Sequence, residues 1–223
     1  MEMNSEDLAR MNKVLRHRLR NTASGIKSAA TLLSKELEDT APPSVLEYFP
    51  LITKECDDLA ELTRRLSLLF DRPPDGGPRR VEALAQILAD RIGRKYPRSE
   101  VVIDCDAAAG ARTVAAADSV LAALLEIVEN AVEAGGNAPV ECEWRSGGDL
   151  VTFRTRSHGE PPEDCERIFL PFYTSRSRHA GMGLAIARRL LAPLGGTVTA
   201  DLGDDAALVV DVVMPDWDRR KAI

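Results

Sequence analysis

Two glycines, Gly181 and Gly183, lie where the backbone could bind an anion. They follow the run Ile168-Phe169-Leu170-Pro171-Phe172-Tyr173-Thr174-Ser175 and open an apolar helical pattern. Because glycine has no side chain, backbone N–H groups can approach a phosphate closely there, and the helix N-terminus adds a favourable dipole. The pattern favours a nucleotide phosphate site, with a plain turn as the alternative for Gly-x-Gly taken alone.

His17 is a candidate phosphoryl acceptor. It stands two residues from both Leu15 and Leu19, which at roughly 100° per residue places it on the polar face of its helix. A neutral imidazole is a good nucleophile, and an exposed ring on a helix can be reached by a second domain. For a histidine taken alone, a solvated surface residue is the alternative.

Glu126 and Asn130 are one turn apart on an expected helix and therefore share a face. The amide oxygen of asparagine is a hard ligand suited to Mg²⁺, an ion that also bridges nucleotide phosphates. Glu126 could bind a metal-bound water or accept a proton. The alternative is that both residues form the polar edge of an amphipathic helix.

Loop residues near these groups could also contact a nucleotide. Ser157-His158-Gly159-Glu160 directly follows an expected strand, and its glycine would let the backbone approach a planar base or would simply make a turn. Arg176 and Arg178 could close over phosphates or be solvated. Phe169 and Phe172 are expected in the core rather than at a ligand.

Two long helices must position His17. Apolar or small residues recur at spacings of three and four from residue 5 to about 37, and a second such stripe runs to about residue 70. Residues 39–44 break the pattern, and Ser44 can cap the second helix. One hairpin has too small a core to be stable alone, so we expect a homodimer in which two copies form a four-helix bundle. The first stripe consists of Leu8, Met11, Leu15, Leu19, Thr22, Ile26, Ala30, Leu33 and Leu37.

The rest of the chain must supply the nucleotide site. Residues 72–78 are dense in proline and glycine and form a linker, so the expected domains are residues 1–71 and 79–223. Helices are expected near residues 80–96, 117–134 and 183–194, and strands near residues 100–104, 140–145, 150–156, 197–202 and 207–214. Strands separated by helices and ending in a hairpin predict an α+β layer, with one mixed sheet and helices on one face.

Composition narrows the class of protein. The net charge of −6 argues against a general nucleic-acid binder. The four cysteines are far apart and form no Cys-x-x-Cys pair, which disfavours metal or disulfide use and favours a reducing compartment. No signal peptide opens the chain, and no apolar run approaches the ~20 residues that a membrane span needs. We therefore expect a cytoplasmic protein without a membrane span.

Taken together, in this order and spacing, these features resemble the cytoplasmic kinase core of a two-component sensor histidine kinase. Residues 5–70 are similar to its dimerisation and histidine-phosphotransfer hairpin. Residues 79–215 are similar to its ATP-binding domain, of the Bergerat fold shared with gyrase, Hsp90 and MutL. The matching motifs are the histidine box (residues 17–30), the asparagine box (residues 125–131), the phenylalanine box (residues 169–174) and the second glycine box (residues 181–184).

The resemblance implies a role for each matching residue. His17 would be phosphorylated, and Asn21 matches the position that orients water when such proteins dephosphorylate their partner. Asn130 would hold Mg²⁺, and Glu126 would assist at the phosphates. The residues that the resemblance places at ATP are Asn130, Ser157, Gly159, Thr174, Arg176, Gly181 and Gly183.

Two positions depart from the family pattern. Arg18 follows the histidine where the family usually has an acid that acts as a general base. Ser157 replaces the aspartate that accepts a hydrogen bond from the adenine amino group, and Glu160 or Pro161 stands at the place of the second glycine. Losing a charged acceptor costs roughly 1.5–3 kcal/mol, so the affinity for ATP should fall about tenfold or more.

The leading functional interpretation is a histidine kinase that autophosphorylates His17 from ATP and Mg²⁺ and passes the phosphoryl group to an aspartate on a response-regulator receiver domain. The alternative is a histidine phosphotransferase with the same dimer, whose degenerate second domain no longer uses ATP. A non-catalytic dimeric scaffold is the third interpretation. The retained Asn130, Gly181 and Gly183 favour the kinase, whereas Ser157 favours the phosphotransferase.

Overall fold

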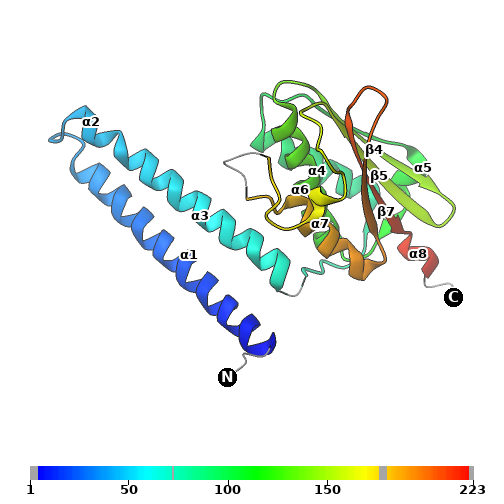
Figure 1. Ribbon diagram of the computed structural model, residues 1–223, viewed down its shortest axis with the longest axis horizontal. Coiled ribbons are helices and arrows are strands. Elements are labelled where there is room, and N and C mark those ends of the chain that lie inside the picture. The colour runs from blue at the N-terminus through cyan, green and yellow to red at the C-terminus, as the bar shows by residue number, and fades with distance from the viewer. Residues whose placement is uncertain (1–4, 72, 176–179, 221–223) are drawn as a thin grey trace. The chain divides into compact units, whose positions relative to one another are not determined.

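The computed structural model describes residues 5–71, 73–175 and 180–220. The chain divides into two compact units, Met1–Asp71 and Arg72–Ile223 (Figure 1). In the described part of the chain, the elements of the first unit are all helices, and the second unit combines a β-sheet with helices. Among the described helices, none combines the length and apolar character that a membrane crossing requires.

The first unit is a hairpin of two long helices, α1 (Ser5–Glu36) and α3 (Tyr48–Phe70), with the short helix α2 (Pro43–Leu46) at the bend. The prediction that Ser44 caps the second helix is wrong, because Ser44 lies inside α2. Pro42 takes the capping position, and its carbonyl accepts a hydrogen bond from Val45 N at 2.9 Å. Pro43 occupies the first turn, where its fixed φ suits a helix and its missing N–H needs no partner.

Small side chains form the seam between α1 and α3. Ala23 and Ala30 are buried on α1, and Cys56 and Thr63 are buried on α3. Each pair is seven residues apart, the spacing at which residues of antiparallel helices return to the same seam. The larger apolar residues of the predicted α1 stripe lie outside this seam, and Leu15, Leu19, Ile26 and Leu33 are all exposed in the single hairpin.

Five strands form the main sheet of the second unit, in the order β2-β4-β5-β7-β6. β2 pairs with β4 in parallel, and the other neighbours pair antiparallel. The predicted mixed sheet is therefore confirmed. The strands are β2 (Val101–Cys105), β4 (Val140–Gly147), β5 (Leu150–Ser157), β6 (Thr197–Leu202) and β7 (Leu208–Pro215).

Helices α4 (Val81–Lys95), α6 (Ala117–Gly135) and α7 (Gly183–Leu191) cover one face of this sheet, as predicted (Figure 1). Strand residues that point to this face form the core, where the rings of Trp144 and Phe153 have centroids 4.9 Å apart. The opposite face carries polar and charged side chains, including an ion pair between Arg154 Nε and Asp211 Oδ1 at 2.7 Å. Alternating burial along the strands thus separates core from solvent.

The sequence pattern does not predict the shortest elements, because two to four residues are too few to show a period. Strands β1 (Arg79–Arg80) and β3 (Thr113–Val114) pair with each other. The other short elements are α5 (Ala107–Gly110), α8 (Trp217–Arg220) and two 3₁₀ turns, Arg167–Phe169 and Ala192–Leu194.

Candidate functional site

His17 lies exposed on α1 of the helical unit. Its Nδ1 atom is 3.2 Å from Nδ2 of Asn21, one helical turn further along the same helix. This contact holds the imidazole by one nitrogen and leaves the other, Nε2, without a contact to Asn21. The exposure of His17 agrees with the polar face expected from the spacing of Leu15 and Leu19 around it.

Four polar residues of α6 line one side of that helix. Glu126 and Glu129 are buried, and Asn130 and Glu133 are half-buried. Their spacing of three and four residues places them on one face, as predicted for Glu126 and Asn130. This face of α6 therefore offers carboxylate and amide oxygens, the atoms that bind Mg²⁺ in proteins.

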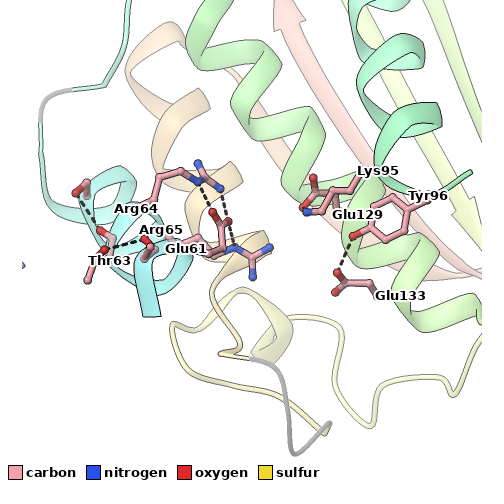
Figure 2. A network of polar contacts seen from close by, with 10 residues as sticks. Glu61, Thr63, Arg64, Arg65, Lys95, Tyr96, Glu129 and Glu133 are labelled. Atoms are coloured by element: carbon pink, nitrogen blue, oxygen red, sulfur yellow. Dashed lines mark hydrogen bonds and ion pairs between the residues drawn. The ribbon is translucent and has the colours of Figure 1, made fainter. Parts of the chain in front are cut away.

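The end of α4 holds this face in place. Lys95 Nζ donates to Glu129 Oε2 at 2.6 Å, and the Tyr96 hydroxyl donates to Glu133 Oε1 at 2.7 Å. Figure 2 shows Lys95 and Tyr96 reaching from the end of α4 toward these two carboxylates. The role of Lys95 is not predictable from the sequence, because 34 residues separate it from Glu129 and no local pattern links the two.

Gly183 brings the start of α7 against α6. A Cβ added at Gly183 would lie 3.3 Å from Glu126 Oε2 and 3.4 Å from the Glu126 carbonyl oxygen. A larger residue would therefore require Glu126 or the start of α7 to shift by a few tenths of an ångström. The structure thus brings Gly183 and Glu126, which the sequence places 57 residues apart, into direct contact.

Gly181 shapes the loop before α7. Its φ of +60° lies in the left-handed region, and an added Cβ would meet the carbonyl oxygen of Tyr173 at 2.5 Å. Its own carbonyl accepts a hydrogen bond from Phe172 N at 2.7 Å. Only glycine fits between the aromatic turn and the start of α7, which explains the Gly-x-Gly spacing.

A second close approach joins the end of β5 to the end of α6. Ser157 is the last residue of β5 and is buried between Val140 and Leu208 on the neighbouring strands. Two residues later, a Cβ on Gly159 would lie 2.7 Å from the carbonyl oxygen of Ala134. The loop after β5 therefore lies against α6 at the helical turn that follows Asn130.

The two phenylalanines expected in the core differ. Phe169 is buried, and the Arg188 guanidinium carbon lies 3.7 Å from its ring centroid. The prediction for Phe172 is wrong, because 62% of this residue is exposed. Its φ of +66°, needed for the turn that closes on Gly181, carries its ring outward. Thr174 is exposed, and Arg176 lies outside the described residues.

The geometry of the second unit suits a nucleotide phosphate with Mg²⁺. Two glycines allow a close packing of the backbone that a Cβ would disturb, and a nine-residue helix begins at the second of them. Glu126 supplies a carboxylate beside this helix start, and Asn130 lies one turn further along the same face of α6. Asn130, Gly181 and Gly183 are the residues that could hold the group, whereas His17 and Asn21 belong to the other unit.

Comparisons with known proteins agree with this geometry. Residues 115–216 match the model of the family described as histidine kinase-, DNA gyrase B-, and HSP90-like ATPase. The chain is 29% identical over 208 residues to the sensory histidine kinase/phosphatase NtrB of Escherichia coli O157:H7, which covers 82% of this chain and 56% of that protein. It is 25% identical over 208 residues to NtrB of Rhizobium meliloti, covering 84% of this chain and 53% of that protein. The chain thus spans about half the length of these relatives.

Solved structures share the fold. Full-length ShkA in complex with AMPPNP aligns over 93% of this chain and 46% of its own, with a TM-score of 0.76 and 21% identity. The Acinetobacter baumannii histidine kinase AdeS aligns over 88% of this chain and 96% of its own, with a TM-score of 0.59 and 13% identity. The family match and the NtrB relatives together support a two-component histidine kinase core with an ATP-binding domain.

Proposed function

We propose that this chain, a two-component histidine kinase core by its fold and its relatives, transfers the γ-phosphoryl group of ATP to His17 and then to an aspartate of a response-regulator receiver domain. The observation that carries the proposal is the exposed His17 imidazole, held at Nδ1 by Asn21, in the same chain as the glycine-lined site between α6 and α7. The comparisons offer no corresponding support for a phosphotransferase without ATP.

Asn21 can prepare His17 for attack. An asparagine amide carries both a donor and an acceptor, and a half-turn about its last bond places Oδ1 instead of Nδ2 at Nδ1 of His17. An oxygen at that position accepts the Nδ1–H bond, which leaves the lone pair on Nε2. Asn21 would thereby orient the His17 imidazole, as an acid directly after the histidine would do. Arg18, which stands at that place, is then not needed for this role.

The second unit would bind ATP with Mg²⁺, which supplies the phosphoryl group and neutralises the charge on it. Asn130 would hold the metal through its amide oxygen, and Glu126 would orient a water or accept a proton beside it. Backbone N–H groups at Gly181 and Gly183 would face the phosphate oxygens. Ser157 and Gly159 would lie at the base, and Thr174 and Arg176 near the phosphates.

Exposed apolar residues on the hairpin support a homodimer. Leu15, Leu19, Ile26 and Leu33 of α1 are each about half exposed in the single hairpin. Burying an Ile or Leu side chain stabilises an assembly by roughly 1.5–3 kcal/mol, so a second hairpin would gain substantially by covering this stripe. We infer that two copies form the four-helix bundle through this surface.

Incubation of the full chain with γ-labelled ATP and Mg²⁺ tests the function. We expect an acid-labile label on the wild type, none on His17→Ala, and little on Asn130→Ala. Gly93→Ala, inside α4 with nothing within 4 Å of the added Cβ, should keep the label. If the wild type takes no label from ATP but accepts phosphate on His17 from a phosphorylated receiver domain, the protein is a phosphotransferase. If it takes label from neither source, the non-catalytic scaffold is the remaining interpretation.

A further inference from the structure

Arg16, the residue before His17, is buried between α1 and α3. Only 3% of its surface is exposed, and it stands seven residues before Ala23 in the seam of small side chains. A guanidinium stays ionised under all ordinary conditions, so burying it is costly unless it is paired and hydrogen-bonded. An arginine in this seam therefore requires dedicated partners.

Those partners lie at the end of α3 and one turn earlier on α1. Arg16 Nη2 donates to Asp71 Oδ1 at 2.5 Å, and Nη1 donates to Asn12 Oδ1 at 2.9 Å. The guanidinium carbon also lies 5.9 Å from the centroid of the Phe70 ring. Asp71 is the last residue of the helical unit, so this pair ties the turn of α1 that carries His17 to the point where the chain leaves α3.

Stability alone does not account for the pair. The Asp71 side chain is 43% exposed, so solvent weakens its attraction to Arg16, and an alanine fills the equivalent place at residues 23 and 30. Unlike a packed alanine, a directional ion pair can fix the rotation of α1 about its own axis. Because successive residues of a helix leave it about 100° apart, a fixed Arg16 also fixes the direction in which His17 leaves the helix.

We propose that Arg16 is a positioning residue for phosphoryl transfer to His17. Its ion pair with Asp71 sets the rotation of α1 at the phosphorylated turn and links that rotation to the start of the connection between the two units. The role in transfer rests on the proposed kinase function, whereas the ion pair as a clamp on α1 does not. The two parts can therefore be tested separately in the full chain.

Amide hydrogen exchange tests the clamp. We expect Arg16→Met and Asp71→Asn to accelerate exchange of the amides of residues 12–21 to a similar extent, with no additive effect in the double variant, because each change removes the same pair. Arg16→Lys keeps a cation and should lie closer to the wild type. Arg20→Met removes an exposed arginine one turn further along α1 and should leave the exchange unchanged.

Autophosphorylation kinetics test the positioning role. We expect Arg16→Met and Asp71→Asn to lower kcat for labelling of His17 about tenfold, since a small misplacement of a reacting group costs that much or more. The KM for ATP should stay within about twofold, because the pair lies outside the nucleotide unit. Arg16→Lys should recover part of the rate. Lys35→Met, which removes an exposed cation in the last turn of α1, should match the wild type.

Each outcome decides one part. Unchanged exchange in both Arg16→Met and Asp71→Asn would overturn the clamp. Faster exchange with wild-type kcat would overturn the positioning role. If exchange is faster in the variants but the wild type takes no label from ATP, the clamp on α1 is supported. The kinase function, and the positioning role that depends on it, are then refuted.

Discussion

Asn21 Nδ2 lies 3.2 Å from His17 Nδ1, one helical turn further along α1. This contact joins the expected nucleophile to a side chain that can present either a donor or an acceptor to it. The residue directly after His17 is Arg18, which cannot accept a proton. Asn21 is therefore the neighbour whose chemistry can set which nitrogen of His17 carries the lone pair.

The first prediction concerns this contact. Asn21→Leu removes both donor and acceptor and should lower autophosphorylation of His17 at saturating ATP about tenfold, the effect of losing one orienting hydrogen bond. Asn21→Asp can only accept, which favours a proton on Nδ1 and a lone pair on Nε2, and should be at least as fast as the wild type. Single-turnover labelling measures both rates. If the Asp variant were as slow as the Leu variant, the accepting role of Asn21 would be refuted.

The second prediction concerns the start of α7. Gly183→Ala places a Cβ 3.3 Å from Glu126 Oε2 and should shift the backbone N–H groups that face a phosphate, raising the Kd for ATP about tenfold. Gly93→Ala is the matched control, because nothing lies within 4 Å of its added Cβ. That variant should leave the Kd unchanged and raise the free energy of unfolding by about 0.5–1 kcal/mol, since Gly93 lies inside α4. Calorimetric titration and urea denaturation measure the two effects, and equal ATP affinities in both variants would contradict the proposed phosphate contact.

Hydrophobic periodicity predicts the long elements of this chain. The long helices and the strands β4, β5, β6 and β7 begin and end within a few residues of their predicted bounds, because each is long enough to repeat its pattern. The cap at the hairpin bend does not follow from the sequence in the same way. Ser44 has the right chemistry for a cap, but two prolines before it start the helix earlier, so local sterics override side-chain preference.

The candidate site is only partly predictable from the sequence. Glu126 and Asn130 share a face because they are one turn apart, and that follows from spacing alone. The contact between Gly183 and Glu126, the ion pair of Lys95 with Glu129 and the burial of Arg16 all depend on how distant segments pack. In the sequence, Arg16 cannot be distinguished from the other basic residues of α1, because its burial depends on the packing of α3 against α1.

The third prediction concerns the apolar stripe on α1. Ile26→Glu places a charge where we expect two hairpins to meet, and each dimer would contain the change twice. Losing roughly 1.5–3 kcal/mol at each copy should raise the dimer dissociation constant about a hundredfold or more. Ser28→Glu, on the exposed polar side of the same helix, is the control and should leave the dimer intact. Sedimentation velocity measures both, and an undiminished dimer in Ile26→Glu would rule out this stripe as the interface.

The fourth prediction concerns thiol reactivity. Burial raises the pKa of Cys142 to about 12, and burial together with neighbouring carboxylates raises the pKa of Cys105 and of Cys165. A raised pKa means less thiolate at a given pH, so alkylation of the folded protein should be slow at pH 8 and accelerate as the pH rises. Cys105 and Cys165 are partly exposed and should react before Cys142, which should wait for unfolding. Iodoacetamide labelling followed by peptide mass analysis gives the order, and early labelling of Cys142 would contradict its burial on β4.

The fifth prediction concerns the base of the nucleotide. Ser157 ends β5 at the position where the resemblance places an aspartate that accepts from the adenine amino group, and its burial keeps water from competing with such a bond. Ser157→Asp should therefore raise the affinity for ATP about tenfold, from the roughly 1.5–3 kcal/mol that a charged acceptor contributes. The unliganded variant should be less stable than the wild type, because burying a carboxylate at this position costs free energy of desolvation. Titration with GTP shows whether the gain comes from recognition of adenine or from tighter binding of any nucleotide. Guanine has a carbonyl where adenine has its amino group, and a carboxylate would repel that carbonyl. Ser157→Asn, with a neutral side chain of similar size, should gain little for either nucleotide. Equal gains for ATP and GTP in Ser157→Asp would mean that this position does not contact the base edge.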